Sequence, residues 1–402
     1  MDKRRTLITA SERVGKLPPY LFAELDRQKQ LSRRKGVDLI DFGIGDPDRP
    51  TPEPIVRACA EALQVPEHHR YPDGRGSGFY RDACRTWLER EFSVTEGVDV
   101  SAVIGSKEGL AHLPMVFCNP GDVVLVPNPG YPVYRASAIL ADATPVDVPL
   151  RRENGFVPDL EELDASVLRR ARMIFLNYPN NPTGAVLTRE QMRRIVEVAR
   201  REDILVVSDN SYSHIRFDGQ PPQSFLQVPG ATDICLELHS FSKTFNMTGW
   251  RVGFIAGSPG LVDTFMGVKE NLDSGVFTAV QRAAEAAVKM DRGHLRSALQ
   301  TYGARRRVLI EGLRELGWDI CGTEGTFYVW AALPRGTDSM AFARKLISRT
   351  GIVVTPGSGF GTYGEGYIRF ALTIPEDRIH KALGRLEGKE IASLWRKVTP
   401  KR

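Results

Sequence analysis

The sequence predicts an α/β protein in which helices cover a mostly parallel sheet, followed by a smaller α+β unit. Short apolar runs alternate with amphipathic helical patterns through the middle of the chain, which is typical of parallel strands joined by helices. Near Asp291 the pattern changes to one long helix followed by a few further strands. Because 402 residues exceed what a single small core organises, we expect two domains.

The expected elements follow from apolar runs, capping residues and the placement of glycine and proline. Thr188-Arg-Glu-Gln191 has the pattern of a capping box and predicts a helix through Arg201. A second helix is expected from Lys107 to Val116, directly after Gly105-Ser106. Further helices are expected at 295–316 and 340–348, and strands at 123–126, 173–176, 204–207, 234–238, 252–256, 327–330 and 367–372. We expect an N-terminal arm with part of the small domain at 1–45, a large domain at 46–288 and a small domain at 289–402.

Composition excludes several classes of protein. Hydrophobic residues make up 42% of the chain and charged residues 26%, which fits a soluble globular protein. The net charge of +5 is mild, and the basic residues match no nucleic-acid-binding module. The five cysteines are scattered without a CxxC pair, so neither a disulfide framework nor a zinc site is expected. With no apparent signal peptide or membrane span, we expect a cytoplasmic protein that binds neither membrane nor nucleic acid.

The segment Ser240-Phe-Ser-Lys243 carries the most specific chemistry. Lys243 follows an apolar run, lies between small hydroxyls and precedes Arg251 by eight residues. A lysine that is partly desolvated beside another cation has a lowered pKa and can hold a carbonyl as a Schiff base. The hydroxyls and Arg251 suit a phosphate monoester, so the combination indicates pyridoxal phosphate. The alternative is an ordinary turn with a solvated lysine, and this segment alone favours that alternative.

Three expected strands end in polar residues with complementary chemistry. Asp209, Asn181 and Lys243 each follow a different strand, where ligands bind in open α/β sheets. The Asp209 carboxylate would hold a pyridine nitrogen protonated; a helix N-cap is the alternative, slightly favoured for this residue in isolation. Tyr212, three residues on, and Asn181 would share the phenolate oxygen of the same ring. A core tyrosine is an equal alternative for Tyr212.

Other segments supply anion-binding groups. Gly105-Ser106-Lys107-Glu108 opens a helix with free backbone donors, which suits an anion, although it is no Walker A motif. Gly357-Ser-Gly-Phe-Gly361 opens no βαβ helix, so we reject a dinucleotide site there. Arg369 lies in a strand whose apolar neighbours predict burial. A buried arginine needs an anion, either an internal carboxylate or the carboxylate of a substrate.

Taken together, these residues resemble the fold-type I pyridoxal-phosphate aminotransferases of the aspartate aminotransferase superfamily, over nearly the whole chain. The specific set is Asn181-Pro-Thr-Gly184, Asp209-x-x-Tyr212, Ser240-x-x-Lys243, Arg251 and Arg369. The resemblance implies a large domain with a mostly parallel, seven-stranded sheet between helices. It also implies a homodimer in which a loop at 273–278 crosses to the partner site.

The resemblance implies a role for each site residue. Lys243 is expected to bond the cofactor aldehyde and then to carry a proton between the substrate Cα and the cofactor. Asp209 pairs with the ring nitrogen, and Arg369 binds the α-carboxylate of the substrate. The other implied cofactor contacts are Tyr212 and Asn181 at the ring oxygen, Tyr131 on the ring face, and Ser106, Lys107, Ser240, Ser242, Arg251 and Tyr71 of the partner subunit at the phosphate. The implied substrate contacts are Tyr20, Gly43, Lys107, Tyr131, Asn181 and Arg369.

Within this superfamily, runs such as Leu17-Pro-Pro-Tyr-Leu-Phe-Ala-Glu24 and Ser208-Asp-Asn-Ser-Tyr212 are most similar to bacterial LL-diaminopimelate aminotransferases. That likeness implies transfer of an amino group from LL-diaminopimelate to 2-oxoglutarate, giving tetrahydrodipicolinate, glutamate and water in lysine biosynthesis. The alternatives are a broad alanine, glutamate or aspartate type of aminotransferase, a β-lyase with the same cofactor, and a non-catalytic protein on this scaffold.

The substrate side chain is less well defined by the sequence. The loop Asp273-Ser-Gly-Val-Phe-Thr278 offers no arginine for a dicarboxylate, which argues against aspartate as the donor. For the distal groups of LL-diaminopimelate we expect contacts from Tyr20, Lys107 and Glu108. The resemblance further implies cis peptide bonds at Asn128-Pro129 and Asn181-Pro182.

Overall fold

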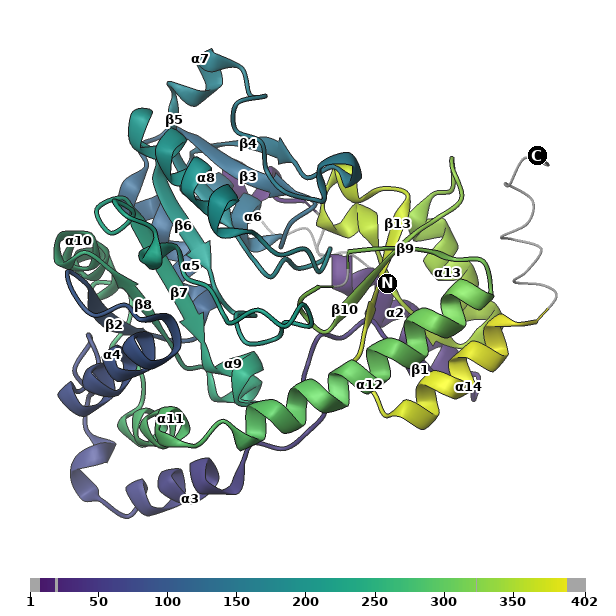
Figure 1. Ribbon diagram of the computed structural model, residues 1–402, viewed down its shortest axis with the longest axis horizontal. Coiled ribbons are helices and arrows are strands. Elements are labelled where there is room, and N and C mark those ends of the chain that lie inside the picture. The colour runs from purple at the N-terminus through teal and green to yellow at the C-terminus, as the bar shows by residue number, and fades with distance from the viewer. Residues whose placement is uncertain (1–7, 19–20, 323, 389–402) are drawn as a thin grey trace.

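The computed structural model describes residues 8–18, 21–322 and 324–388 and contains two main sheets (Figure 1). The larger sheet has seven strands in the order β2-β8-β7-β6-β5-β3-β4. Strands β3 to β7 are parallel to one another, and β8 runs antiparallel to both of its neighbours. The strands are β2 (Asp99–Val103), β3 (Val123–Asn128), β4 (Thr144–Pro149), β5 (Ala171–Leu176), β6 (Leu205–Asp209), β7 (Cys235–Ser240) and β8 (Gly253–Gly257). The expected mostly parallel, seven-stranded sheet is therefore confirmed.

Both faces of this sheet are buried, as expected for parallel strands. Alternate side chains of β3 enter two different cores, with Val123 and Leu125 on one face and Val124 and Val126 on the other. Helices cover both cores, which explains why the strands read as continuous apolar runs. The helices of this part are α3 (Glu53–Ala62), α4 (Gly78–Phe92), α5 (Ser106–Phe117), α6 (Val133–Leu140), α7 (Ala165–Leu168), α8 (Arg189–Arg201), α9 (Phe241–Thr244), α10 (Pro259–Lys269) and α11 (Thr278–Lys289).

Helix α8 has the bounds that the sequence predicts, and its N-terminal capping contacts explain where it begins. Its N-cap Thr188 accepts a hydrogen bond from the Gln191 amide, and the Gln191 side chain accepts one from the Thr188 amide, which completes the capping box. Met192, Ile195 and Val196 lie on the buried side of the helix. The capping box therefore fixes the start of α8, and its apolar side packs on the sheet.

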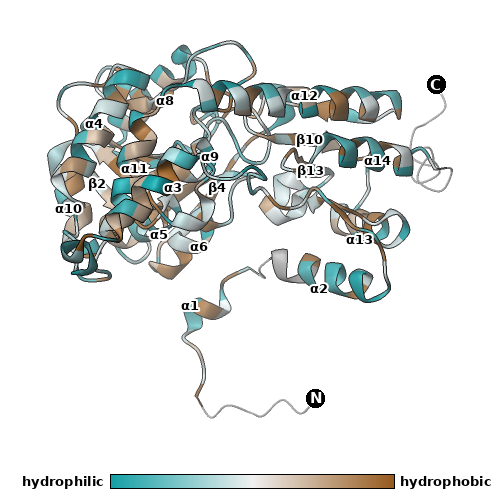
Figure 2. Cartoon of the chain, turned by 90° about the horizontal axis from the view of Figure 1, so that it is seen from below, coloured by the Kyte–Doolittle hydropathy of each residue, from teal (hydrophilic) through white to brown (hydrophobic). Residues whose placement is uncertain are grey.

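The smaller sheet has four strands in the order β12-β13-β10-β9. The long helix α12 leads from the large sheet toward it and runs beside α14, as Figures 1 and 2 both show. A two-residue strand from the N-terminal part, β1 (Ile40–Asp41), pairs in parallel with β11 of the C-terminal part. The elements of this region are α12 (Gly293–Glu315), β9 (Asp319–Cys321), β10 (Tyr328–Ala332), α13 (Ser339–Thr350), β11 (Ile352–Val353), β12 (Thr355–Pro356), β13 (Tyr367–Ala371) and α14 (Glu376–Leu386).

The N-terminal residues contain two helices, α1 (Glu12–Gly15) and α2 (Leu21–Arg34). Helix α1 lies beside α6, where the Arg13 side chain donates to the Leu140 carbonyl at 3.2 Å, and α2 lies near α13 (Figure 2). The boundaries that the sequence predicts at residues 45 and 288 stay a prediction, although the strands of the two main sheets fall on either side of residue 288. No helix in the described ranges is long and apolar enough to cross a membrane.

Candidate active site

A cavity of about 250 Å³ lies at the carboxyl ends of β5, β6 and β7. Strands run toward it from the large sheet, and Tyr328, Phe360 and Arg369 close it from the C-terminal part. Eleven residues that the sequence predicts for the site line this cavity: Ser106, Lys107, Tyr131, Asn181, Asp209, Tyr212, Ser240, Ser242, Lys243, Arg251 and Arg369. The fold thus brings together side chains from segments that lie far apart in the sequence.

Lys243 stands on α9, the short helix that follows β7. The Ser240 side chain caps this helix by accepting a hydrogen bond from the Ser242 amide at 3.2 Å. The lysine side chain is half-buried, and its Nζ donates a 2.7 Å hydrogen bond to the Gly45 carbonyl. Burial, together with the positive charges of Arg369 and Arg251, lowers the pKa of Lys243 to about 8, although the negative charge of Asp46 opposes the shift. The amine is therefore neutral more often near pH 7 than a solvated lysine would be, and the neutral amine is the form that acts as nucleophile and base.

Asp209 ends β6 with its carboxylate buried at the cavity wall. Tyr134 donates a 2.8 Å hydrogen bond to one carboxylate oxygen, and the Ser211 hydroxyl donates a 2.5 Å hydrogen bond to the other. Burial raises the pKa of Asp209, while these hydrogen bonds lower it. Asp209 caps no helix, and within the described ranges it has no ion-pair partner. The carboxylate is therefore suited to a cation that enters the cavity.

Arg251 and Lys107 form a cationic corner of the cavity. Gly105, with φ of +74°, precedes α5, and a Cβ atom there would lie 2.4 Å from the Arg251 guanidinium. Glycine therefore lets Arg251 approach the first turn of the helix. The Arg251 side chain also donates a 2.7 Å hydrogen bond to the Thr248 carbonyl. Together with Ser106 and Lys107 this corner offers hydroxyl, amide and cationic donors, which suit a phosphate group.

Arg369 lies on β13 and is only 3% exposed. Its guanidinium donates to the Asn181 side-chain oxygen at 2.7 Å and to the Gly43 carbonyl at 3.1 Å. Its Nε has no hydrogen-bond partner in the structure, and no ion pair to Arg369 occurs among the described residues. The internal ion pair considered from the sequence is therefore absent from this part of the chain. A buried guanidinium without a carboxylate partner is suited to a carboxylate ligand.

Two tyrosines connect the halves of the cavity. The hydroxyls of Tyr212 and Tyr328 lie 3.1 Å apart, and burial raises the pKa of Tyr212. The Tyr328 ring lies under Arg369, with 4.0 Å between the ring centroid and the guanidinium carbon. A Cβ atom on Gly45 would lie 1.9 Å from the Tyr328 hydroxyl. A glycine is therefore required at position 45 for Tyr328 and the Lys243 acceptor to share this space.

Five residues that line the cavity were not predicted from the sequence: Tyr134, Ser211, Asn177, Tyr328 and Gly45. Asn177 donates from its amide to the Asp209 carbonyl at 2.8 Å and accepts from the Asn181 amide at 2.8 Å. Ser211 lies inside the Asp209-x-x-Tyr212 run, where its position between two site residues was an available signal. Tyr328 and Gly45 reach the site only through the tertiary fold.

Three described residues named from the sequence do not line the cavity of this subunit: Gly43, Tyr71 and Glu108. Gly43 contacts it indirectly, because its carbonyl accepts from Arg369. Tyr71 lies on the surface with 90% of its side chain exposed. The Glu108 carboxylate accepts from the Ile104 amide and faces Lys269. Tyr20 lies outside the described residues.

Glu108, His112 and Asp273 form a cluster that was not predicted from the sequence. The side-chain atoms that could bind a metal ion lie within 4.8 Å of one another. Lys269, which is 1% exposed, already places its ammonium 2.7 Å from Asp273 and 3.4 Å from Glu108. The cation of this cluster is therefore an amino group of the chain itself.

The peptide bonds at Asn128-Pro129 and Asn181-Pro182 are cis, as predicted, and Tyr178-Pro179 is a third that was not predicted. The turns that contain Asn128 and Asn181 both lead into the cavity wall.

Comparison with known proteins agrees with this geometry. Residues 37–386 match the family described as aminotransferase class I and II. The LL-diaminopimelate aminotransferase of Desulforudis audaxviator is 48% identical over 94% of this chain and 97% of its own length, and that of Aquifex aeolicus is 47% identical over 95% and 99%. The structure of a Thermus thermophilus aspartate aminotransferase mutant superimposes with a TM-score of 0.88 at 29% identity, covering 94% of this chain and 99% of that one. The chain belongs to the class I and II aminotransferases.

Proposed function

We propose that this aminotransferase uses pyridoxal phosphate to transfer an amino group from LL-diaminopimelate to 2-oxoglutarate, giving tetrahydrodipicolinate, glutamate and water. The observation that carries the proposal is the buried, carboxylate-free Arg369 beside a lysine with a pKa of about 8. Curated relatives that are 43–48% identical to this chain over almost its full length are named for LL-diaminopimelate, which supports this substrate.

The residues of the cavity fit the cofactor at both ends. Arg251, Lys107 and the hydroxyls of Ser106, Ser240 and Ser242 match a phosphate dianion, and Arg251 has no ion-pair partner in the described ranges. The buried carboxylate of Asp209 matches a protonated ring nitrogen. When bound, pyridoxal phosphate supplies an aldehyde that bonds amines and a ring that withdraws electrons. Tyr131, Tyr212 and Asn181 also line the cavity. Tyr131 would cover the face of such a ring, and Tyr212 and Asn181 would hold its oxygen.

The chain performs the acid–base work of the reaction. Lys243 is proposed to take the proton from the substrate Cα and would deliver it to the former aldehyde carbon of the cofactor, since its pKa of about 8 suits both proton transfers. Arg369 binds the α-carboxylate and so holds the Cα–H bond toward the lysine. This orientation makes the proton transfer effectively unimolecular. Asp209 keeps the ring nitrogen protonated, which stabilises negative charge that develops at Cα.

We also infer that the enzyme is a homodimer with shared sites. Tyr71 is 90% exposed, an unusual state for a large aromatic side chain. Phe277 is 39% exposed nearby, with its ring centroid 6.2 Å from that of His69. A second copy of the chain that covered this surface would bury these rings and bring Tyr71 of the partner subunit to the phosphate. Light scattering would test this inference, and a monomer with full activity would contradict it.

A donor screen against 2-oxoglutarate tests the substrate. Purified holoenzyme is incubated with LL-diaminopimelate, meso-diaminopimelate, aspartate and alanine, and glutamate formation is measured. Turnover restricted to the LL isomer supports the proposal. Broad turnover of alanine or aspartate would replace it with a general aminotransferase, and pyruvate and ammonia released from cystathionine would indicate a β-lyase.

A further inference from the structure

A single buried amide joins the two segments that the proposed dimer sends toward its partner. These segments, residues 71–77 and residues 273–278, are called the crossing platform here. Gln281 on α11 is 0% exposed. Its side-chain oxygen accepts from the Ser77 amide at 2.8 Å, and its side-chain nitrogen donates to the Val276 carbonyl at 2.6 Å. One side chain therefore fixes the end of one segment to the middle of the other.

The two segments also touch directly. Gly275 has φ of +87°, and a Cβ atom there would lie 3.1 Å from the Asp73 carbonyl and 3.2 Å from the Gly74 Cα. Gly76, with φ of +90°, is equally crowded, because a Cβ atom added there would lie 2.9 Å from the Ala102 side chain. Both positions need glycine for the backbone conformation and for the close approach. The crossing platform is therefore a packed unit rather than two independent loops.

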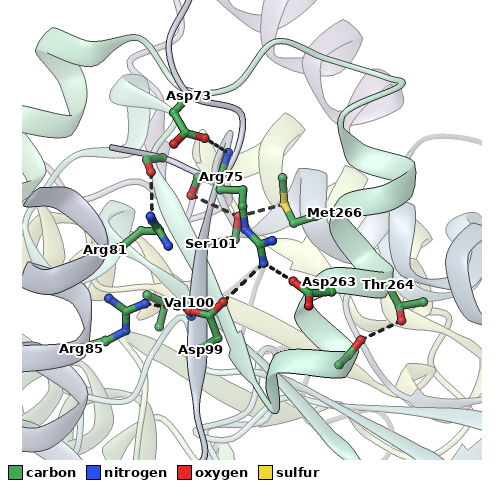
Figure 3. A network of polar contacts seen from close by, with 12 residues as sticks. Asp73, Arg75, Arg81, Arg85, Asp99, Val100, Ser101, Asp263, Thr264 and Met266 are labelled. Carbon is green, nitrogen blue, oxygen red and sulfur yellow. Dashed lines mark hydrogen bonds and ion pairs between the residues drawn. The ribbon is translucent and has the colours of Figure 1, made fainter. Parts of the chain in front are cut away.

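Arg75 fastens this platform to the large sheet (Figure 3). Its guanidinium contacts Asp263 of α10 at 2.5 Å and Asp99 of β2 at 3.4 Å. Its carbonyl accepts from the Ala102 amide at 2.9 Å and from the Ser101 hydroxyl at 3.2 Å. The side chain and the backbone of one residue thus connect the platform to a strand and to a helix.

Tyr71 stands just before this anchored turn and is 90% exposed, so its own subunit holds it mainly through the backbone. We propose that Gln281 and Arg75 are positioning residues that act in trans: they hold Tyr71 where it can bind the cofactor phosphate in the site of the partner subunit. The inference rests on the shared site of the proposed function. Loosening the platform displaces a phosphate ligand in the other subunit and leaves the contacts of its own subunit's site in place.

Mixed dimers distinguish an effect in trans from a general loss of structure. Two differently tagged chains are co-expressed, and doubly tagged dimers are purified. In the first dimer one chain carries Lys243→Ala and the other carries Gln281→Met. In the second dimer one chain carries both substitutions and the other is wild type. The two dimers contain the same substitutions, and each has one site with an intact Lys243.

The affinity of that intact site for pyridoxal phosphate is measured from the absorbance of the cofactor bound to Lys243. We expect native affinity in the first dimer, because its working site receives Tyr71 from the chain with Gln281 intact. In the second dimer we expect binding about tenfold weaker, since a displaced Tyr71 loses a hydrogen bond to a charged phosphate, which contributes about this much to affinity. Equal affinity in the two dimers, or weaker binding in the first, would overturn the proposal.

Two further pairs of dimers complete the test. Arg75→Ala, at a position nearer the surface, replaces Gln281→Met in the same arrangements, so the proposal stays testable if the buried substitution prevents folding. Tyr71→Phe in the same arrangements tests the shared site itself. Asymmetry for Tyr71→Phe without asymmetry for the other two refutes the positioning role alone. No asymmetry for Tyr71→Phe refutes the shared site of the proposed function.

Discussion

The Tyr134 hydroxyl donates a 2.8 Å hydrogen bond to the Asp209 carboxylate, and both groups are buried. This bond favours the charged form of a carboxylate whose pKa burial would otherwise raise further. The tyrosine thus helps to keep negative charge at the position where the ring nitrogen of the cofactor is proposed to bind.

Replacing Tyr134 with phenylalanine tests this relationship. A hydrogen bond to a charged group is worth about 1.5–3 kcal/mol, so we expect pyridoxal phosphate to bind about 10- to 100-fold more weakly, with a lower kcat. Cofactor affinity is measured by absorbance titration. Tyr178→Phe is the matched control, because it also removes a hydrogen bond from a tyrosine, to the Phe156 carbonyl, but at a position that does not line the cavity. Unchanged affinity in Tyr134→Phe would contradict the assigned role.

The lowered pKa of Lys243 predicts how stability depends on pH in the cofactor-free protein. The folded pKa of about 8 lies below the ordinary value of 10.5, so the unfolded chain binds more protons between these values and stability rises with pH across that window. Below pH 8 the cost of the buried charge is fully present, on the order of 3 kcal/mol. Lys243→Met is therefore expected to melt at a higher temperature than the wild type at pH 7, with the difference shrinking toward pH 10.5. A constant difference across this range would argue against the shifted pKa.

Arg369 should support function at the expense of stability. Arg369→Met removes a buried guanidinium without a carboxylate partner, so we expect the cofactor-free protein to gain about 0.5–2 kcal/mol. The value of kcat/KM should fall at least about 100-fold through loss of a bidentate carboxylate contact. Arg305→Met is the comparison, because Arg305 is buried against Asp48 at 2.7 Å and its loss should destabilise the protein. Urea unfolding and steady-state kinetics measure both effects; destabilisation in both variants would refute the contrast.

Lys269 is expected to be essential for stability. Lys269→Met leaves the carboxylates of Glu108 and Asp273 without their buried cation, which should cost about 3–5 kcal/mol. Adding Asp273→Asn should recover part of this loss, because it removes one of the unpaired charges. Lys289→Met, at an exposed pair with Glu285, should change the free energy of unfolding by less than about 1 kcal/mol. Additive effects in the double variant would show that the two residues are not coupled.

Gly45 provides a steric test of the cavity. Gly45→Ala places a methyl group 1.9 Å from the Tyr328 hydroxyl, so that tyrosine or the Gly45 carbonyl that binds Lys243 must move. A displacement of about 1 Å is expected to lower kcat about 100-fold. Gly384→Ala on α14 meets no atom within 4 Å and should leave kcat unchanged. Steady-state kinetics compare the two variants, and equal kcat values would mean that the cavity adjusts without cost.

Local patterns in the sequence predicted the central strands and the residues at their ends. The strands β3, β5, β6, β7 and β8 were predicted because apolar runs mark strands buried on both faces. The edge strand β4 was missed, since its partly exposed residues lack such a run. Strand β2 is buried but was also missed, because Asp99 and Ser101 interrupt its apolar pattern.

Tyr134 and Tyr328 were missed at the site for a different reason. Tyr134 is 75 positions from Asp209, and Tyr328 is 116 positions from Tyr212, so neither contact leaves a local pattern. Glu108 was expected at the substrate but does not line the cavity, for a similar reason. Its carboxylate lies against Lys269, which is 161 positions away in the sequence. Sequence patterns give the residues that each strand carries to the site, whereas tertiary packing decides which side chains hold them there.

The pairing of β1 with β11 has a consequence for anyone who recombines this enzyme with its relatives. The stretch around residues 40–45 supplies the Gly43 carbonyl to Arg369 and the Gly45 carbonyl to Lys243, while its strand belongs to the C-terminal sheet region. A chimera that exchanges only the C-terminal part would separate Arg369 and Tyr328 from the backbone they evolved against. Residues 40–45 should therefore be inherited together with 289–388 as one discontinuous module.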